Sequence, residues 1–72
     1  MQLLDYQTIE NFFLTSRGYT ARFATYQDDD QGQLEFGEIL KGDKIVRRKL
    51  VPDIESAKEW LALGWNAETR NN

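Results

Sequence analysis

The sequence contains no cysteine and no histidine, and only one proline. Without cysteine, no disulfide can compensate for the small core of a 72-residue chain. The same absences disfavour a tightly bound transition metal, because thiolate and imidazole are its strongest protein ligands. We therefore expect no metal and no cofactor. Stability must come from aromatic packing, for which the chain has four Phe, three Tyr and two Trp, or from self-association.

Motifs that carry catalysis are also missing. The sequence has no Gly-x-Ser-x-Gly element, no phosphate-binding loop and no dinucleotide-binding glycine pattern. Ser16 and Ser56 have no apparent general base. These absences predict a protein that is not an enzyme and has no small-molecule substrate.

Long hydrophobic runs are absent as well. No segment approaches the roughly 18–20 apolar residues that span a bilayer. The first residues, Met1–Asp5, lack the basic and long apolar regions of a secretory signal peptide. We expect a cytoplasmic protein without membrane contact, for which a lack of cysteine is typical.

Charge is distributed unevenly along the chain. Residues 1–40 carry seven acidic and two basic side chains, whereas residues 41–72 carry seven basic and five acidic ones. The net charge of −3 therefore divides into an acidic and a basic part. Such a dipolar molecule can orient a charged partner, although solvation of a small surface explains the same charges.

Apolar spacing predicts a first helix from about Leu4 or Thr8 to Arg17. Ile9, Phe12 and Phe13 follow helical spacing, and Asp5 or Thr8 is its expected N-cap. Gly18 is the expected left-handed residue that ends it.

Three strands are predicted next, at Tyr19–Gln27, Gln33–Leu40 and Lys44–Val51. The segment Asp28–Gly32 joins the first two, and a two-residue type II′ turn at Gly42-Asp43 joins the last two. That turn implies four pairs of opposite residues, namely Leu40 and Ile45, Ile39 and Val46, Glu38 and Arg47, and Phe36 and Lys49. One face then holds Leu34, Phe36, Leu40, Ile45 and Val51, and the other holds Ile39, Val46 and Leu50. Gly37 is a candidate position for a bulge that would shift these faces.

A second helix is predicted from Ile54 to Leu63. Pro52 ends the preceding strand and Asp53 is the expected N-cap. Gly64 and Trp65 are expected to end the helix, with Trp65 packing back on its last turn or standing exposed. The domain is expected to cover residues 1–66, followed by a frayed polar tail at 67–72.

These elements predict an α+β fold in the order α-β-β-β-α. Two amphipathic helices would cover one face of a three-stranded antiparallel meander. The other face keeps aliphatic side chains, so we expect it to meet the termini, a partner or a second copy. A non-catalytic protein–protein interaction module, such as an adaptor, inhibitor or accessory subunit, is the leading functional hypothesis, and a homodimer remains open.

Five residues are candidates for partner binding. Tyr26 lies at a strand end where we expect exposure, and Tyr and Trp dominate interface hot spots. The carboxylates of the acidic turn can engage a basic partner, while a solvated turn is the simpler interpretation. They lack the spacing of a calcium loop. The candidates are Tyr26, Asp28, Asp29, Asp30 and Trp65.

Nucleic-acid binding is the alternative hypothesis. The third strand and the turn before it concentrate positive charge at Lys41, Lys44, Arg47, Arg48 and Lys49. Alternation places Arg47 and Lys49 on one face and Arg48 on the other. Charge that protects an exposed edge strand from aggregation explains the same pattern.

The α-β-β-β-α order resembles the double-stranded RNA-binding domain, whose last helix opens with a lysine-rich segment. Here residues 53–62 match only its cap and its Ala57-Lys58 pair. The two phosphate-contacting lysines of that family fall on Ile54 and Glu55, so the resemblance implies a similar architecture and argues against similar RNA binding. Three strands and a helix are also similar to DNA-reading domains of plant transcription factors and integrases. That likeness would place Arg47 and Arg48 near DNA, although the first strand here is not rich in Arg and Trp.

Overall fold

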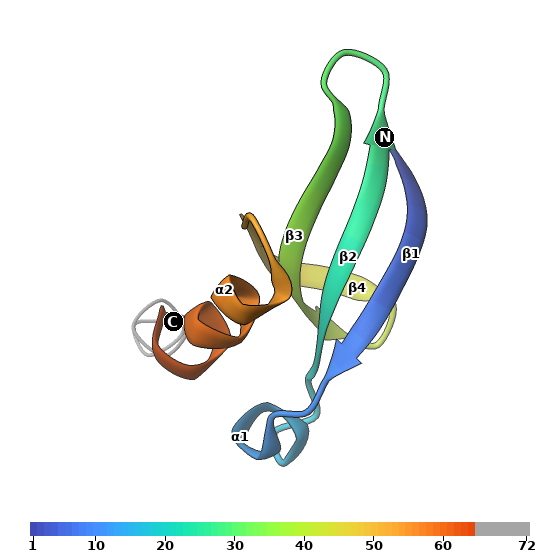
Figure 1. Cartoon of the computed structure of the whole chain (residues 1–72). Coiled ribbons are helices and arrows are strands. Elements are labelled where there is room, and N and C mark those ends of the chain that lie inside the picture. The colour runs from blue at the N-terminus through green and yellow to red at the C-terminus, as the bar shows by residue number, and fades with distance from the viewer. Residues whose placement is uncertain (65–72) are drawn as a thin grey trace.

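The fold is that of a computed structural model, which describes residues 1–64. The elements in chain order are β1 (Gln2–Ile9), α1 (Phe12–Thr15), β2 (Thr20–Asp28), β3 (Gly32–Lys41), β4 (Lys44–Leu50), α2 (Ile54–Glu59) and the π-helical turn η1 (Trp60–Gly64). The strands form one antiparallel sheet in the order β1-β2-β3-β4 (Figure 1). The predicted α+β class is confirmed, with four strands where three were expected. The expected Trp65 contact and the tail at 67–72 lie outside the described residues.

The predicted first helix is wrong over most of its length. Residues Gln2–Ile9 form an edge strand that pairs with β2, and only Phe12–Thr15 are helical. Strand pairing satisfies the backbone groups along the outer side of β2, and this tertiary gain outweighs a helical spacing of apolar residues. The N-cap is Asn11, whose Oδ1 accepts the Leu14 N–H at 3.0 Å, in place of Asp5 or Thr8.

Both predicted hairpin turns are present. The Asp28 carboxylate accepts the N–H groups of Asp30 and Gln31, each at 3.2 Å, and Gly32 has a φ of 78°. At the second turn Gly42 has a φ of 62°, while Asp43 does not have a positive φ. A positive φ at the first central residue alone matches the predicted type II′ turn.

Strand β4 contains a bulge that the sequence analysis did not place. Leu40 pairs with Ile45 as predicted, but the register then shifts, so that Ile39 opposes Arg47. The extra residue is Val46, and Gly37 pairs regularly with Lys49. Because a one-residue shift exchanges the faces of a strand, Arg48 and not Arg47 lies opposite Glu38. Phe36 likewise opposes Leu50 and not Lys49. Val51 lies in the core, whereas Leu50 lies on the opposite face of the sheet.

The core lies between the sheet and α2. Asp53 caps α2 as predicted, accepting the Ser56 N–H at 2.8 Å, a bond that lowers the pKa of Asp53. In Figure 1, α2 lies beside β3, and α1 lies at the end of the sheet opposite the 28–32 turn. The core residues are Ile9, Leu14, Ala21, Ile39, Val51, Ala57, Trp60 and Leu61. No helix in residues 1–64 has the length and apolar character needed to cross a bilayer.

Gly37 sets the distance between α2 and the sheet. A Cβ atom at this position would lie 3.0 Å from Cε3 of Trp60 and 3.3 Å from Cβ of Ala57. The indole ring therefore rests directly on the β3 backbone, and a residue in mid-strand must be glycine for this contact.

The substitution Gly37→Ala should lower the free energy of unfolding by about 1–3 kcal/mol, because the added methyl group overpacks the contact with Trp60. Urea unfolding followed by tryptophan fluorescence measures this change. Thr20→Ala, at an exposed position of β2, is the control and should change stability by less than about 0.5 kcal/mol. Equal stability of the two variants would contradict the close approach.

Candidate interaction site

The second face of the sheet carries a row of polar side chains, one from each strand. The register aligns Thr8, Arg22, Glu38 and Arg48 across β1, β2, β3 and β4. Alternation turns these residues away from the core, which lies on the side of α2. We call this surface the arginine face.

Glu38 is the centre of the row and is completely buried. Its Oε1 accepts a hydrogen bond from Nε of Arg22 at 2.7 Å, and its Oε2 accepts one from Nε of Arg48 at 3.2 Å. The Tyr26 hydroxyl also donates a hydrogen bond to Oε2 of Glu38. The same hydroxyl accepts a hydrogen bond from Nη2 of Arg48 at 2.9 Å. Within residues 1–64, no buried side-chain nitrogen or oxygen lacks a hydrogen-bond partner. A buried carboxylate is tolerated only when it is paired and hydrogen-bonded in this way.

The pKa values of the cluster follow from these contacts. Burial alone would raise the pKa of Glu38, but the hydrogen bonds from Tyr26, Arg48 and Arg22 outweigh it and lower that pKa. Burial and the bond to Glu38 raise the pKa of Tyr26. For Arg22, burial lowers the pKa, but its bonds to Glu38 and Tyr26 prevail and raise it. At neutral pH the cluster therefore contains two cations, one anion and a neutral tyrosine.

Aromatic rings hold the two arginines from the sides. The Arg22 guanidinium lies 4.9 Å from the centre of the Tyr6 ring. The Arg48 guanidinium lies 4.7 Å from the Phe36 ring and 5.0 Å from the Tyr26 ring. Stacking on aromatic faces suits the planar guanidinium and fixes its orientation.

An apolar band borders the charged row. In the next row of the register, Tyr6 on β1 is aligned with Ala24, Phe36 and Leu50. Tyr6 is 54% exposed and Leu50 is 58% exposed, at the two ends of this row. The band consists of Leu3, Tyr6, Leu34, Phe36 and Leu50. Exposed apolar area next to arginine is typical of protein-binding surfaces.

The expected exposure of Tyr26 is wrong, because its side chain is only 6% exposed and its hydroxyl is used by Glu38. Asp28, Asp29 and Asp30 lie at the β2–β3 turn, away from the charged row. Trp65 lies outside the described residues. The arginine cluster was not foreseen because the bulge at Val46, which brings Arg48 opposite Glu38, has no clear signature in the sequence.

The basic residues of the alternative hypothesis lie on two faces. Arg48 belongs to the arginine face, while Arg47 and Lys49 share the other face, as predicted. Arg47 donates to the Val46 carbonyl at 2.8 Å, and the Lys41 ammonium lies 4.9 Å from the Tyr19 ring. Lys44 is exposed beside the Gly42-Asp43 turn.

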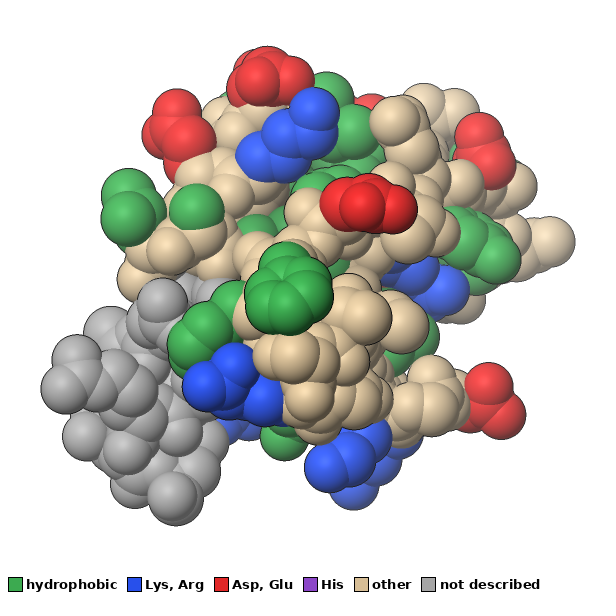
Figure 2. Space-filling view, turned by 90° about the horizontal axis from the view of Figure 1, so that it is seen from below, with side chains coloured by type: hydrophobic (Ala, Val, Ile, Leu, Met, Phe, Trp, Pro, Cys, Tyr) green, Lys and Arg blue, Asp and Glu red, His purple; other side chains and the backbone are tan. Residues whose placement is uncertain are grey.

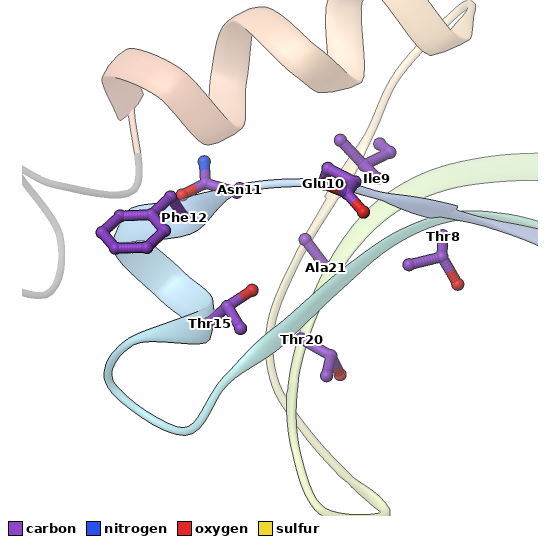
Figure 3. A pocket seen from close by; sticks show the side chains of 8 residues that line it. All are labelled: Thr8, Ile9, Glu10, Asn11, Phe12, Thr15, Thr20 and Ala21. Atoms are coloured by element: carbon purple, nitrogen blue, oxygen red, sulfur yellow. The ribbon is translucent and has the colours of Figure 1, made fainter.

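A shallow pocket of about 200 Å³ lies at the α1 end of the sheet (Figure 3). Its lining residues are Thr8, Ile9, Glu10, Asn11, Phe12, Thr15, Thr20 and Ala21. Glu10 is the only carboxylate in this lining. In residues 1–64, no group of three or more acidic, Cys or His side chains is placed to hold a metal ion.

Comparison with known proteins finds no matching family model, no matching curated protein and no matching solved structure. The order that resembles the double-stranded RNA-binding domain is wrong, because β1 replaces its first helix.

The substitution Glu38→Gln should lower the free energy of unfolding by about 3 kcal/mol at pH 7, because it leaves two partly buried guanidinium groups without their anion. Urea unfolding measures the change. Glu35→Gln, on the same strand but the opposite face, removes the same charge and should cost less than about 0.5 kcal/mol. Similar losses in both variants would contradict a special role of Glu38.

The contribution of Glu38 should also depend on pH. Its pKa in the folded state lies below the ordinary value of 4.5, so its stabilising effect is complete above that pH and is lost as the pH falls through the folded-state pKa. The difference in unfolding free energy between the natural chain and Glu38→Gln should therefore shrink below pH 4.5. A difference that stays constant from neutral to strongly acidic pH would refute the ionised cluster.

Proposed function

We propose that the chain is a non-catalytic protein–protein interaction module, acting as an adaptor, inhibitor or accessory subunit, and that its partner binds the apolar band. The observation that carries the proposal is the row in which Tyr6 and Leu50, each more than half exposed, lie at the two ends, with Ala24 and Phe36 between them. Tyrosine and arginine are the residues that most often dominate binding energy at protein interfaces.

The arginine cluster supports this proposal by being rigid before binding. Arg22 and Arg48 are each held by the Glu38 carboxylate and by at least one aromatic ring. Side chains that are already ordered lose less conformational entropy when a partner binds.

The charge of the row also indicates the chemistry of the partner. Two guanidinium groups oppose one carboxylate, which leaves a net charge of about +1 beside the apolar band. A partner surface with apolar side chains next to one carboxylate complements both features.

Nucleic-acid binding is the second candidate. The observation that favours it is that Arg47 and Lys49 share one face of β4, close to Lys44. It ranks lower because Arg48 is engaged by Glu38 and the whole chain carries a net charge of −3.

The test is to capture partners from a lysate of the source cells on the immobilised chain. Leu50→Ser should weaken capture of the specific partner by at least about tenfold, because Leu50 lies in the apolar band. Leu63→Ser is the matched control, since Leu63 is 76% exposed and lies outside the band. Equal capture by both variants would overturn the proposed surface.

The same experiment separates the second candidate. Nucleic acid that is captured and then released by salt would support the basic strand in place of the apolar band. The substitution Arg47→Glu should then weaken capture, and unchanged capture would exclude that site.

A further inference from the structure

The two edges of the sheet are protected to different degrees. Strand β4 has four basic residues among seven and a bulge at Val46, features that discourage pairing with another strand. Strand β1 has eight residues with one charge, Asp5, and seven of the eight are exposed. It includes the exposed apolar side chains of Leu4 and Tyr6. Its own bulge lies near the start of the strand, between Leu3 and Asp5.

The outer side of β1 presents backbone groups in its second half. The Tyr6 N–H is bound by Oδ1 of Asp5 at 2.8 Å, so it points away from β2. Successive residues of a strand direct their backbone groups to opposite sides, so Thr8 also directs its N–H and C=O outward. The Tyr6 C=O and both backbone groups of Thr8 are thus open to a further antiparallel strand, and pairing at Tyr6 also requires the Asp5 carboxylate to release the Tyr6 N–H.

The sequence of β1 complements itself in the register centred on Tyr6. When two copies pair around a two-fold axis at Tyr6, the two Tyr6 residues face each other, as a cross-strand aromatic pair. Asp5 then lies opposite Gln7 of the second copy, and an amide can donate to a carboxylate. A register centred on Asp5 would instead place two carboxylates in direct opposition, which is destabilising.

We propose that β1 is a self-association edge, at which two copies of the chain pair antiparallel around Tyr6 and join their four-stranded sheets into one continuous sheet. The interface is isologous and closed, so it produces dimers and not fibres. It consists mainly of one strand from each copy, which is small for a stable complex, so the dimer forms only at high protein concentration. The proposal does not depend on the proposed function. Both surfaces include Tyr6, but the partner surface is tested at Leu50, which lies on β4 at the opposite edge of the sheet from β1.

Light scattering at protein concentrations from about 10 µM to 1 mM tests the proposal, because small interfaces associate in this concentration range. The mass should rise from 8.4 kDa towards twice this value. Gln7→Glu should raise the dissociation constant by about tenfold or more, because it opposes Asp5 of the second copy at two symmetric positions. Combining it with Asp5→Lys should restore association by creating opposite charges at the same positions.

A chain that stays monomeric at about 1 mM would overturn the proposal, and so would a dimer that Gln7→Glu does not weaken. Amide hydrogen exchange of the natural chain provides a measurement without variants, since the Thr8 N–H should become protected as concentration rises. Exchange at Thr8 that is independent of concentration would also overturn it. The proposed function fails separately, through equal capture by Leu50→Ser and Leu63→Ser at concentrations where the chain is monomeric.

Discussion

The carboxylate of Glu38 joins three strands on the side of the sheet that α2 does not cover. Arg22 and Tyr26 reach it from β2, and Arg48 reaches it from β4. Desolvating a carboxylate is costly, so the cluster is stable only because each of its buried polar atoms is hydrogen-bonded. The cluster contributes to the fold by specifying the register of β2, β3 and β4, since only one alignment of these strands brings both arginines to one anion.

Strand β3 organises both sides of the molecule through two neighbouring residues. Gly37 faces α2 and lets the Trp60 ring rest on the backbone, while Glu38 faces the arginines. The bulge at Val46 connects the two sides, because it moves Arg48 opposite Glu38 and leaves Val51 in the core. The hydrophobic packing and the ionic row thus depend on the same register. In Figure 2, which looks onto the α1 end, hydrophobic side chains reach the surface between acidic and basic ones, so apolar exposure is not confined to the band.

Local sequence signals predicted the two hairpin turns and the start of α2. The glycines of both turns and the Asp53 cap correspond to the structure because each depends on residues close in sequence. Strand β1 was taken for a helix because Ile9, Phe12 and Phe13 keep helical spacing across the boundary between the strand and α1. Its true state depends on pairing with β2, a contact that no local pattern contains. The site was missed for a related reason, since one inserted residue at Val46 decides which arginine meets Glu38.

Each strand of the sheet pairs with the strand that directly precedes or follows it in the chain. Every pairing therefore closes a short loop, and the longest of these connections contains only the one-turn helix α1. The entropy lost in closing such loops is small, and proteins dominated by near-neighbour contacts fold quickly for their size. The hairpins can form in succession along the chain, with the burial of Glu38 requiring three strands to be present at once. The ionic row can therefore form only after these three strands have paired. It stabilises only chains in which the strands have paired in the correct register.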